Sequence, residues 1–281
     1  MTASRPIRVI SDTAFLTAVH RARESERPDA VFRDPFARRL AGQRGEEIAS
    51  VIRACHEWTF TARTWLFDRI VLDAVGSGVD TVVNLAAGLD ARPYRLDLSA
   101  SLRWVEVDLP ELFAHKVPLL EGARPRCALE RVPLDLADQG ARRKLFEDIG
   151  RGAKDTLVLA EGLLVYLAEE DVASLARDLA AAPRFRRWAF DLASPGLVRL
   201  LQKKVGGKFA EGGVALRFGP PAGPAFFSAH GWRPLEVHSR LKAAARLKRL
   251  PFLLRLLAVL PESQGAQGAR PWSGVCLLER R

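Results

Sequence analysis

The chain has 281 residues, of which 48% are hydrophobic and 27% charged, a composition typical of globular enzymes and unlike that of disordered or fibrous chains. Its length favours one domain with an N-terminal extension over two separate domains. The net charge is +10, but basic and aromatic residues do not alternate as they do in proteins that stack on bases, so we expect no nucleic-acid partner.

The cysteines and the apolar runs exclude further classes. Cys55, Cys127 and Cys276 lie far apart and form no CxxC pair, and the histidines are scattered, so we expect neither a disulfide framework nor a metal site. Residues 1–25 lack the apolar stretch of a secretory signal. The longest apolar run, near Phe252–Leu260, is too short to span a bilayer. We expect a cytoplasmic protein with no stable membrane insertion.

The N-terminal part of the chain reads as helices. Residues Ser11–Glu24 have apolar side chains at helical spacing and begin with three residues able to cap a first turn. Asp34-Pro35 opens a short helix, because proline is tolerated in a first turn. A further helix is predicted from about Thr59 to Ala74. Residues 1–78 are therefore expected to form a helical cap.

From Asp80 onward, short apolar runs that end in acidic or small residues alternate with helical stretches, which indicates a parallel sheet with crossovers. The fold class predicted for residues 79–281 is α/β, a Rossmann-like, doubly wound and mostly parallel sheet, with an insertion around 195–260. Seven strands are predicted: Thr81–Ala86, Arg103–Val107, Leu129–Leu134, Thr156–Ala160, Trp188–Asp191, Leu235–His238 and Gly274–Glu279.

A basic, leucine-rich segment lies within that insertion. Pro251 should interrupt any single helix over residues 238–260. The stretch Arg240–Arg255 contains six basic residues and no acid, which fits either a lid that attracts acidic substrates or a solvated helix face. The solvated face is the favoured interpretation.

The first predicted strand enters a tight turn. In the run from Val82 to Asp90, VVNLAAGLD, Gly88 removes a side chain that would block a ligand. The run lacks the GxGxxG with which dinucleotide sites hold two phosphates, so a ligand without phosphates is preferred.

Acidic residues close the next strands. Asp108 ends the second strand, where a ribose diol would be bound, and Asp135 and Glu161 end the third and fourth. Because the carboxyl ends of parallel strands line one crevice, Gly88 and these three acids should face the same ligand. The arrangement suits a nucleoside that carries a positively charged tail.

These residues resemble the leucine carboxyl methyltransferase-like family of class I S-adenosylmethionine-dependent methyltransferases, including its bacterial polyketide-type O-methyltransferases. The resemblance covers nearly the whole chain. One departure is Ala86, where the family usually has glycine, and we expect only a slightly tighter turn there. The matching segments are Arg21–Glu24, Asp34–Ala37, Arg63 with Asp68, Asn84–Arg95, Val105–Pro110, Lys116, Asp135-Leu136, Glu161–Leu167 and Asp191.

The resemblance implies S-adenosylmethionine as cofactor and assigns roles to single residues. Arg63 would bind the methionine carboxylate, with Arg21 or Arg23 as a second clamp. Glu161 would face the methionyl amino group. The remaining cofactor contacts would come from Gly88, Asp108 with the adjacent Leu109, and Asp135 with Leu136, of which Asp108 would hold the ribose and Asp135-Leu136 the adenine edge.

Each assignment has a structural alternative. Asp108 could cap the following helix, Arg63 could lie on a solvated helix face, and Asp135 and Glu161 could make hydrogen bonds that only hold strand ends.

Three further residues stay open. Asp90 and Arg92 could bind the ligand, or could form an ion pair that holds the turn. Tyr166, the candidate catalytic residue, could border the transferring methyl group or pack at a helix start.

The resemblance favours an oxygen acceptor on a small molecule, a carboxylate or a hydroxyl, in secondary metabolism. A carboxylate needs no general base, whereas a phenol or alcohol does. An apolar acceptor pocket is expected from the N-terminal helices together with Phe209, Phe218, Phe226, Phe227 and Trp232. The alternatives are a non-catalytic S-adenosylmethionine-binding protein and a nicotinamide-dependent oxidoreductase on the same fold.

Overall fold

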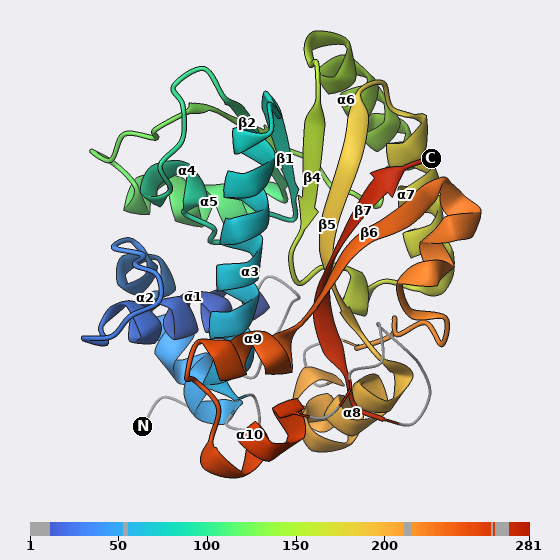
Figure 1. Cartoon of the computed structure of the whole chain (residues 1–281). Coiled ribbons are helices and arrows are strands. Elements are labelled where there is room, and N and C mark those ends of the chain that lie inside the picture. Colours follow the sequence, from blue (N-terminus) through green and yellow to red (C-terminus); the bar gives the residue numbers. More distant parts are fainter. Residues whose placement is uncertain (1–11, 53–55, 211–214, 260, 262–269) are drawn as a thin grey trace.

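A seven-stranded sheet forms the centre of the molecule in this computed structural model, which describes residues 12–52, 56–210, 215–259, 261 and 270–281 (Figure 1). The strand order is β3-β2-β1-β4-β5-β7-β6. Strands β1 to β5 are parallel, and β7 runs antiparallel to β5 and β6. The strands are β1 Thr81–Leu85, β2 Arg103–Asp108, β3 Ala128–Pro133, β4 Thr156–Ala160, β5 Phe185–Ala193, β6 Trp232–Ser239 and β7 Ser273–Arg280.

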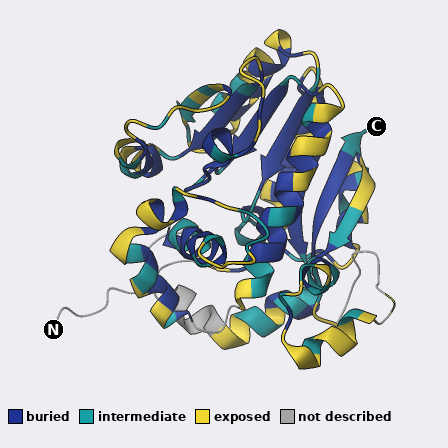
Figure 2. Cartoon of the chain, turned by 60° about the vertical axis from the view of Figure 1, so that its left-hand side comes forward, coloured by how far each residue is buried: buried dark blue, intermediate teal, exposed yellow. Residues whose placement is uncertain are grey.

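Helices cover both faces of this sheet, which explains its continuous apolar strands. One face packs against α6 (Gln139–Gly152) and α7 (Glu169–Ala181), and the other against α3 (Glu57–Gly76) and α9 (Arg240–Arg246). Every residue of β1 and β4 is buried in consequence (Figure 2). The α/β fold predicted from the sequence, with its mostly parallel seven-stranded sheet, is confirmed.

The N-terminal helices lie against α3 and the adjoining end of the sheet (Figure 1). Helix α1 spans Asp12–Ser25 and packs closely on α2, Ala37–Val51. The sequence predicted only a short helix after Asp34-Pro35, whereas α2 has 15 residues and a break at Gly42, where φ is +53°. Glycine at this position lets two helical segments continue as one element.

Short helices connect the remaining elements. Helices α9 and α10 are separated by Pro251, so the predicted interruption of the basic segment is present. No helix among the described residues is long and apolar enough to cross a membrane. The further elements are α4 Arg92–Arg95, α5 Pro110–Leu119, η1 Leu164–Tyr166, α8 Pro195–Ala210, η2 Gly223–His230 and α10 Phe252–Val259.

The aromatic residues assigned to an acceptor pocket lie in the core instead. Phe227 and Trp232 are fully buried and contact the Trp188 ring at 5.2 and 5.6 Å between centroids. Phe218 and Phe226 pack on the same cluster. The prediction was wrong for these four because they pack into the core cluster that contains Trp188 and Phe190 of β5. The side chain of Phe209 lies outside the described residues.

Candidate functional site

A cavity of about 820 Å³ lies where the carboxyl ends of β1, β2, β3 and β4 meet the N-terminal helices. This volume falls within the range of roughly 300–1,000 Å³ typical of small-molecule pockets. The proposed catalytic residue and the seven principal cofactor contacts all line this cavity: Arg63, Gly88, Asp108, Leu109, Asp135, Leu136, Glu161 and Tyr166. The structure therefore brings together residues that lie about a hundred positions apart in the chain.

The turn after β1 adopts a left-handed backbone at two positions. Both Ala86 and Gly88 have φ of +51°. A left-handed alanine costs about 1–2 kcal/mol, so the departure at Ala86 strains the backbone in addition to tightening the turn. A Cβ at Gly88 would lie 3.1 Å from the Cβ of Ala14, which shows that α1 packs directly over this turn.

Asp108 ties the end of β2 to the turn after β1. Its Oδ2 accepts a hydrogen bond from the Gly88 amide at 2.6 Å, and its Oδ1 accepts one from the Leu109 amide at 2.7 Å. Burial raises the pKa of the Asp108 carboxyl, while the two amides oppose this shift. The contact with Leu109 fixes the end of β2, but Asp108 does not cap the following helix: the N-cap residue of α5 is Leu109, and no side chain caps this helix. The Asp108 carboxylate borders the cavity.

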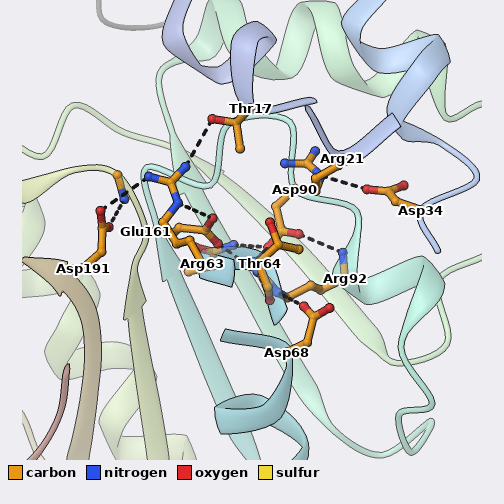
Figure 3. A network of polar contacts seen from close by, with 12 residues as sticks. Thr17, Arg21, Asp34, Arg63, Thr64, Asp68, Asp90, Arg92, Glu161 and Asp191 are labelled. Carbon is orange, nitrogen blue, oxygen red and sulfur yellow. Dashed lines mark hydrogen bonds and ion pairs between the residues drawn. The ribbon is translucent and has the colours of Figure 1, made fainter. Parts of the chain in front are cut away.

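Arg63 projects from α3 into the cavity, where acidic groups surround it (Figure 3). Its Nε lies 3.0 Å from Glu161 Oε1, and its Nη1 lies 3.4 Å from Asp191 Oδ2. Nη2 donates to Thr17 Oγ1 at 3.2 Å. Since Arg63 is only 8% exposed, the solvated-face alternative does not hold.

A second arginine supports the same acid from behind. Arg92 Nη2 lies 2.8 Å from Glu161 Oε2, and its Nε and Nη1 lie 2.7 and 2.9 Å from Asp68 and Asp90 (Figure 3). Burial opposes ionisation of Asp90, but the charge of Arg92 keeps the pKa of that carboxyl well below its ordinary value. The turn-holding ion pair left open by the sequence is thus present, and both residues also line the cavity.

The loop after β3 forms a partly exposed wall of the cavity. Asp135 is exposed and its Oδ1 accepts from the Ala137 amide at 2.9 Å. The carbonyl of Leu136 accepts from Arg142 Nη1 at 2.8 Å, and Arg142 is itself paired with Asp178. Sequence reasoning missed Arg142, because a single arginine on a charged helix carries no distinguishing signal.

The two candidate clamp residues on α1 point in different directions. Arg21 lines the cavity, where its Nε contacts Asp34 at 2.9 Å and its Nη2 donates to the Leu89 carbonyl. Arg23 instead pairs with Glu46 and Glu57, outside the cavity lining. The geometry therefore favours Arg21 for any contact with a ligand here.

Asp191, at the end of β5, has partners that sequence reasoning did not assign. It accepts hydrogen bonds from the Gly162 amide and from Arg240 Nη2, besides its contact with Arg63. Arg240 begins α9 and lines the cavity, so this basic residue does not lie on a solvated helix face. Tyr166 lines the cavity too, and packs against the N-terminal helices.

Beyond these charged groups the cavity becomes apolar. Leucines of α8, α9 and α10 meet aromatic residues of α3 and the chain before β7. The apolar lining includes Trp58, Phe60, Leu163, Val165, Leu197, Leu200, Leu201, Leu216, Leu241, Leu254, Leu257 and Trp272. A polar compartment at the strand ends thus continues into an apolar one.

Residues 14–180 match the family model described as leucine carboxyl methyltransferase, a match that covers more than half of the chain. The chain belongs to the leucine carboxyl methyltransferase family. This confirms the resemblance drawn from the sequence, and with it the expectation of an enzyme.

Relatives extend this match over the rest of the chain. A provisionally named S-adenosyl-L-methionine-dependent methyltransferase of Parafrankia sp. (strain EAN1pec) is 34% identical over 92% of this chain and 88% of its own length. A second one, of Streptomyces avermitilis, is 33% identical over 83% of this chain and 86% of its own.

Solved structures share the fold at low identity. A DUF574 family protein of Streptomyces avermitilis has a TM-score of 0.59 at 16% identity, with 94% of this chain and 96% of that one covered. A protein of Thermobifida fusca, described as a provisional methyltransferase, has a TM-score of 0.57 at 14% identity, covering 100% and 97% of the two chains.

Proposed function

We propose that this chain transfers a methyl group from S-adenosylmethionine to an oxygen atom, a carboxylate or a hydroxyl, of a small apolar molecule in secondary metabolism. Family membership supplies the coarser part, since the chain is an S-adenosylmethionine-dependent methyltransferase. The observation that supports the finer part is the two-part cavity, charged at the strand ends and apolar beyond them.

The charged compartment fits an amino-acid zwitterion. Arg63 Nε and Glu161 Oε1 form an ion pair at 3.0 Å. A zwitterion can replace this pair, because its carboxylate can bind Arg63 while its ammonium group binds Glu161. In the proposed site Arg63 binds the methionine carboxylate and Glu161 the amino group, with Arg21 as the proposed second clamp on the carboxylate. Arg92 holds the Glu161 carboxylate ready for this contact.

The nucleoside end fits the residues around β2 and β3. Asp108 borders the cavity with an oxygen pair already oriented by two amides, and in the proposed site it accepts hydrogen bonds from the ribose hydroxyls. Gly88 and Leu109 lie beside it and allow close approach of the backbone. Asp135 and Leu136 form the wall against which the adenine would lie.

S-adenosylmethionine, when bound, supplies a methyl group on a positively charged sulfur, which is already an activated leaving group. The protein then has to align an acceptor oxygen with that methyl group. Tyr166 is the proposed catalytic residue, because it lines the cavity five positions after Glu161. A carboxylate acceptor needs no proton acceptor, whereas a hydroxyl acceptor would lose its proton to a neighbouring group.

In the proposed organisation, residues 1–78 form a helical cap and residues 79–281 form the cofactor-binding domain. The proposed location of the protein is the cytoplasm. Within the second part, α8, α9 and α10 of the segment around 195–260 contribute leucines to the acceptor compartment, whereas β6 belongs to the sheet.

Calorimetric titration with S-adenosylmethionine and with NAD(H) tests this assignment. We expect micromolar binding of the former only, and a loss of at least about tenfold for Arg63→Ala and for Asp108→Ala, because each removes a charged partner from a partly desolvated ligand. Arg69→Ala is the matched control, since Arg69 lies on the same helix with 58% of its side chain exposed.

Unchanged affinity in both folded variants would refute the cofactor site. Binding without turnover of any carboxylate or hydroxyl compound would instead favour a non-catalytic binding protein. For Tyr166→Phe, we expect a change in turnover with unchanged cofactor affinity.

A further inference from the structure

Helix α10 exposes an apolar surface that no other described part of the chain covers. Of its eight residues none is buried, and Phe252, Leu253, Leu256 and Val259 are 74, 76, 66 and 83% exposed. Other exposed large hydrophobic residues among the described ones are single and less exposed, as in Leu235 at 49%. Contiguous exposed apolar surface on a helix marks an interaction site.

Positive charges surround this apolar surface. Arg255 is exposed on α10, and Lys248 is exposed just before this helix. On α8, the exposed basic residues are Arg199, Lys203 and Lys204. Neither residues 195–210 nor residues 240–259 include an acidic residue. Two copies of the chain that met across this surface would bring like charges together, whereas anionic headgroups would neutralise them.

The same helix reaches the inside of the molecule. Leu254 and Leu257 of α10 line the cavity, as does Lys204 of α8. Both helices lie at one end of the molecule, away from the edge formed by α6 and α7 (Figure 1). The exposed apolar surface is therefore continuous with the apolar compartment of the cavity.

We propose that α10 is an interfacial anchor, which inserts Phe252, Leu253, Leu256 and Val259 into the headgroup region of an anionic membrane while the surrounding lysines and arginines bind lipid phosphates. A short helix that exposes apolar side chains beside basic residues can bury them at the membrane interface without spanning the bilayer. If the proposed methyl transfer also holds, acceptors dissolved in the membrane can enter the cavity past Leu254 and Leu257. The docking itself does not depend on that activity.

Vesicle flotation tests the anchor on the full chain. The probes are vesicles of phosphatidylcholine with roughly one third phosphatidylglycerol and vesicles of phosphatidylcholine alone, at about 0.1 M salt. We expect flotation with the anionic vesicles, at least about tenfold weaker in the triple variant Phe252→Ser, Leu253→Ser, Leu256→Ser. The matched control changes three exposed apolar residues elsewhere to serine, Leu72, Val117 and Leu235.

The charge contribution has its own variant. Replacing Lys248 and Arg255 with glutamine should weaken binding to anionic vesicles about fivefold for each charge and leave binding to neutral vesicles unchanged. Absence of flotation with anionic vesicles overturns the proposal, as does equal loss in the control. The alternative occupant of this surface is a second copy of the chain. If sedimentation showed a dimer that the triple variant abolishes, the proposal would also be overturned.

Discussion

Gly162 allows the Arg63 guanidinium to approach the backbone after β4 closely. Its φ is +72°, and a Cβ built there would lie 3.2 Å from Arg63 Nη1. Its amide also donates to Asp191, which contacts the same arginine. Any side chain at Gly162 therefore displaces the group to which we assign the cofactor carboxylate.

We expect Gly162→Ala to weaken S-adenosylmethionine binding about tenfold in calorimetric titration, in addition to a backbone cost of about 1 kcal/mol. Gly122→Ala is the control, because Gly122 has φ of +79° and nothing within 4 Å of its added Cβ. The control should lose similar stability and keep its affinity. Equal affinities in the two variants would argue against the role of Arg63.

His20 is a buried base without a hydrogen-bond partner among the described residues. Both ring nitrogens lack one, and the ring stacks on Phe60 with centroids 4.2 Å apart. Burial lowers the pKa of His20 from 6.5 to about 4; the charge of Glu57 opposes this shift, and the charges of Arg23 and Arg63 support it. The folded protein thus holds this ring neutral where the unfolded chain binds a proton.

Because the folded pKa is the lower one, the stability from His20 is complete above pH 6.5 and is lost as the pH falls towards 4, by up to about 3 kcal/mol. We expect His20→Phe to remove this part of the pH dependence in urea unfolding at about pH 7 and about pH 4.5. At neutral pH the variant should be at least as stable as the wild type, since it removes two unpaired buried nitrogens. If the free energy of unfolding of His20→Phe fell between the two pH values as much as that of the wild type, the role of His20 would be refuted. His238→Gln, at a more exposed histidine, is the control.

Helix α3 makes buried ion pairs through two charged side chains, Arg63 and Asp68, which project from different sides of the helix. Asp68 lies one turn and one residue beyond Arg63 and accepts from Arg92 at 2.7 Å and from Arg95 at 2.6 Å. It is 6% exposed, so both arginines would lose a buried partner with it. The position of α3, and with it that of Arg63, depends on this contact.

We expect Asp68→Asn to lower the free energy of unfolding by about 3 kcal/mol, since removal of one partner leaves buried charge uncompensated. Asp73→Asn on the same helix should change it by less than about 0.5 kcal/mol, because Asp73 is 69% exposed and 3.6 Å from Arg69. Denaturant unfolding compares the two. Equal losses would mean that the buried pair adds no more than an exposed one.

Elements with a local signature were predictable from the sequence. All seven predicted strands are present, and β1 and β4 are mostly apolar because helices cover both of their faces. The outer strands β3 and β6 are partly exposed and include charged residues. The insertion of β7 between β5 and β6 was not predictable in this way. Strand order depends on contacts between distant segments, which local periodicity does not contain.

The same limit applies to the site. Acids at strand ends predicted that Asp108, Asp135 and Glu161 would share a cavity, since topology alone brings strand ends together. The ion pairs of Arg63 with Glu161 and Asp191 depend on how α3 is oriented against the sheet. The spacing of residues in the sequence does not predict that orientation. Phe227 and Trp232 lie in the core, and the presence of aromatic residues in a segment does not predict whether they line a pocket or pack in the core.

For the whole molecule, a ligand at the junction of cap and sheet should stabilise both. S-adenosylmethionine at about a hundred times its dissociation constant should add about 2.7 kcal/mol to the free energy of unfolding, which corresponds to a rise in Tm of about 5 °C for a chain of this length. Scanning calorimetry with NAD(H) as the comparison checks this. A rise of equal size with NAD(H) would favour the oxidoreductase alternative.

The place of β7 in the sheet sets the order in which the molecule can be completed during translation. Strand β6 leaves the ribosome before β7 but pairs within the sheet only with β7, and residues 240–272 separate the two. Until β7 follows, β5 has an open edge beside the buried residues Trp188 and Phe190. A nascent chain at this stage presents an unpaired apolar strand, the feature that chaperones protect and that drives aggregation.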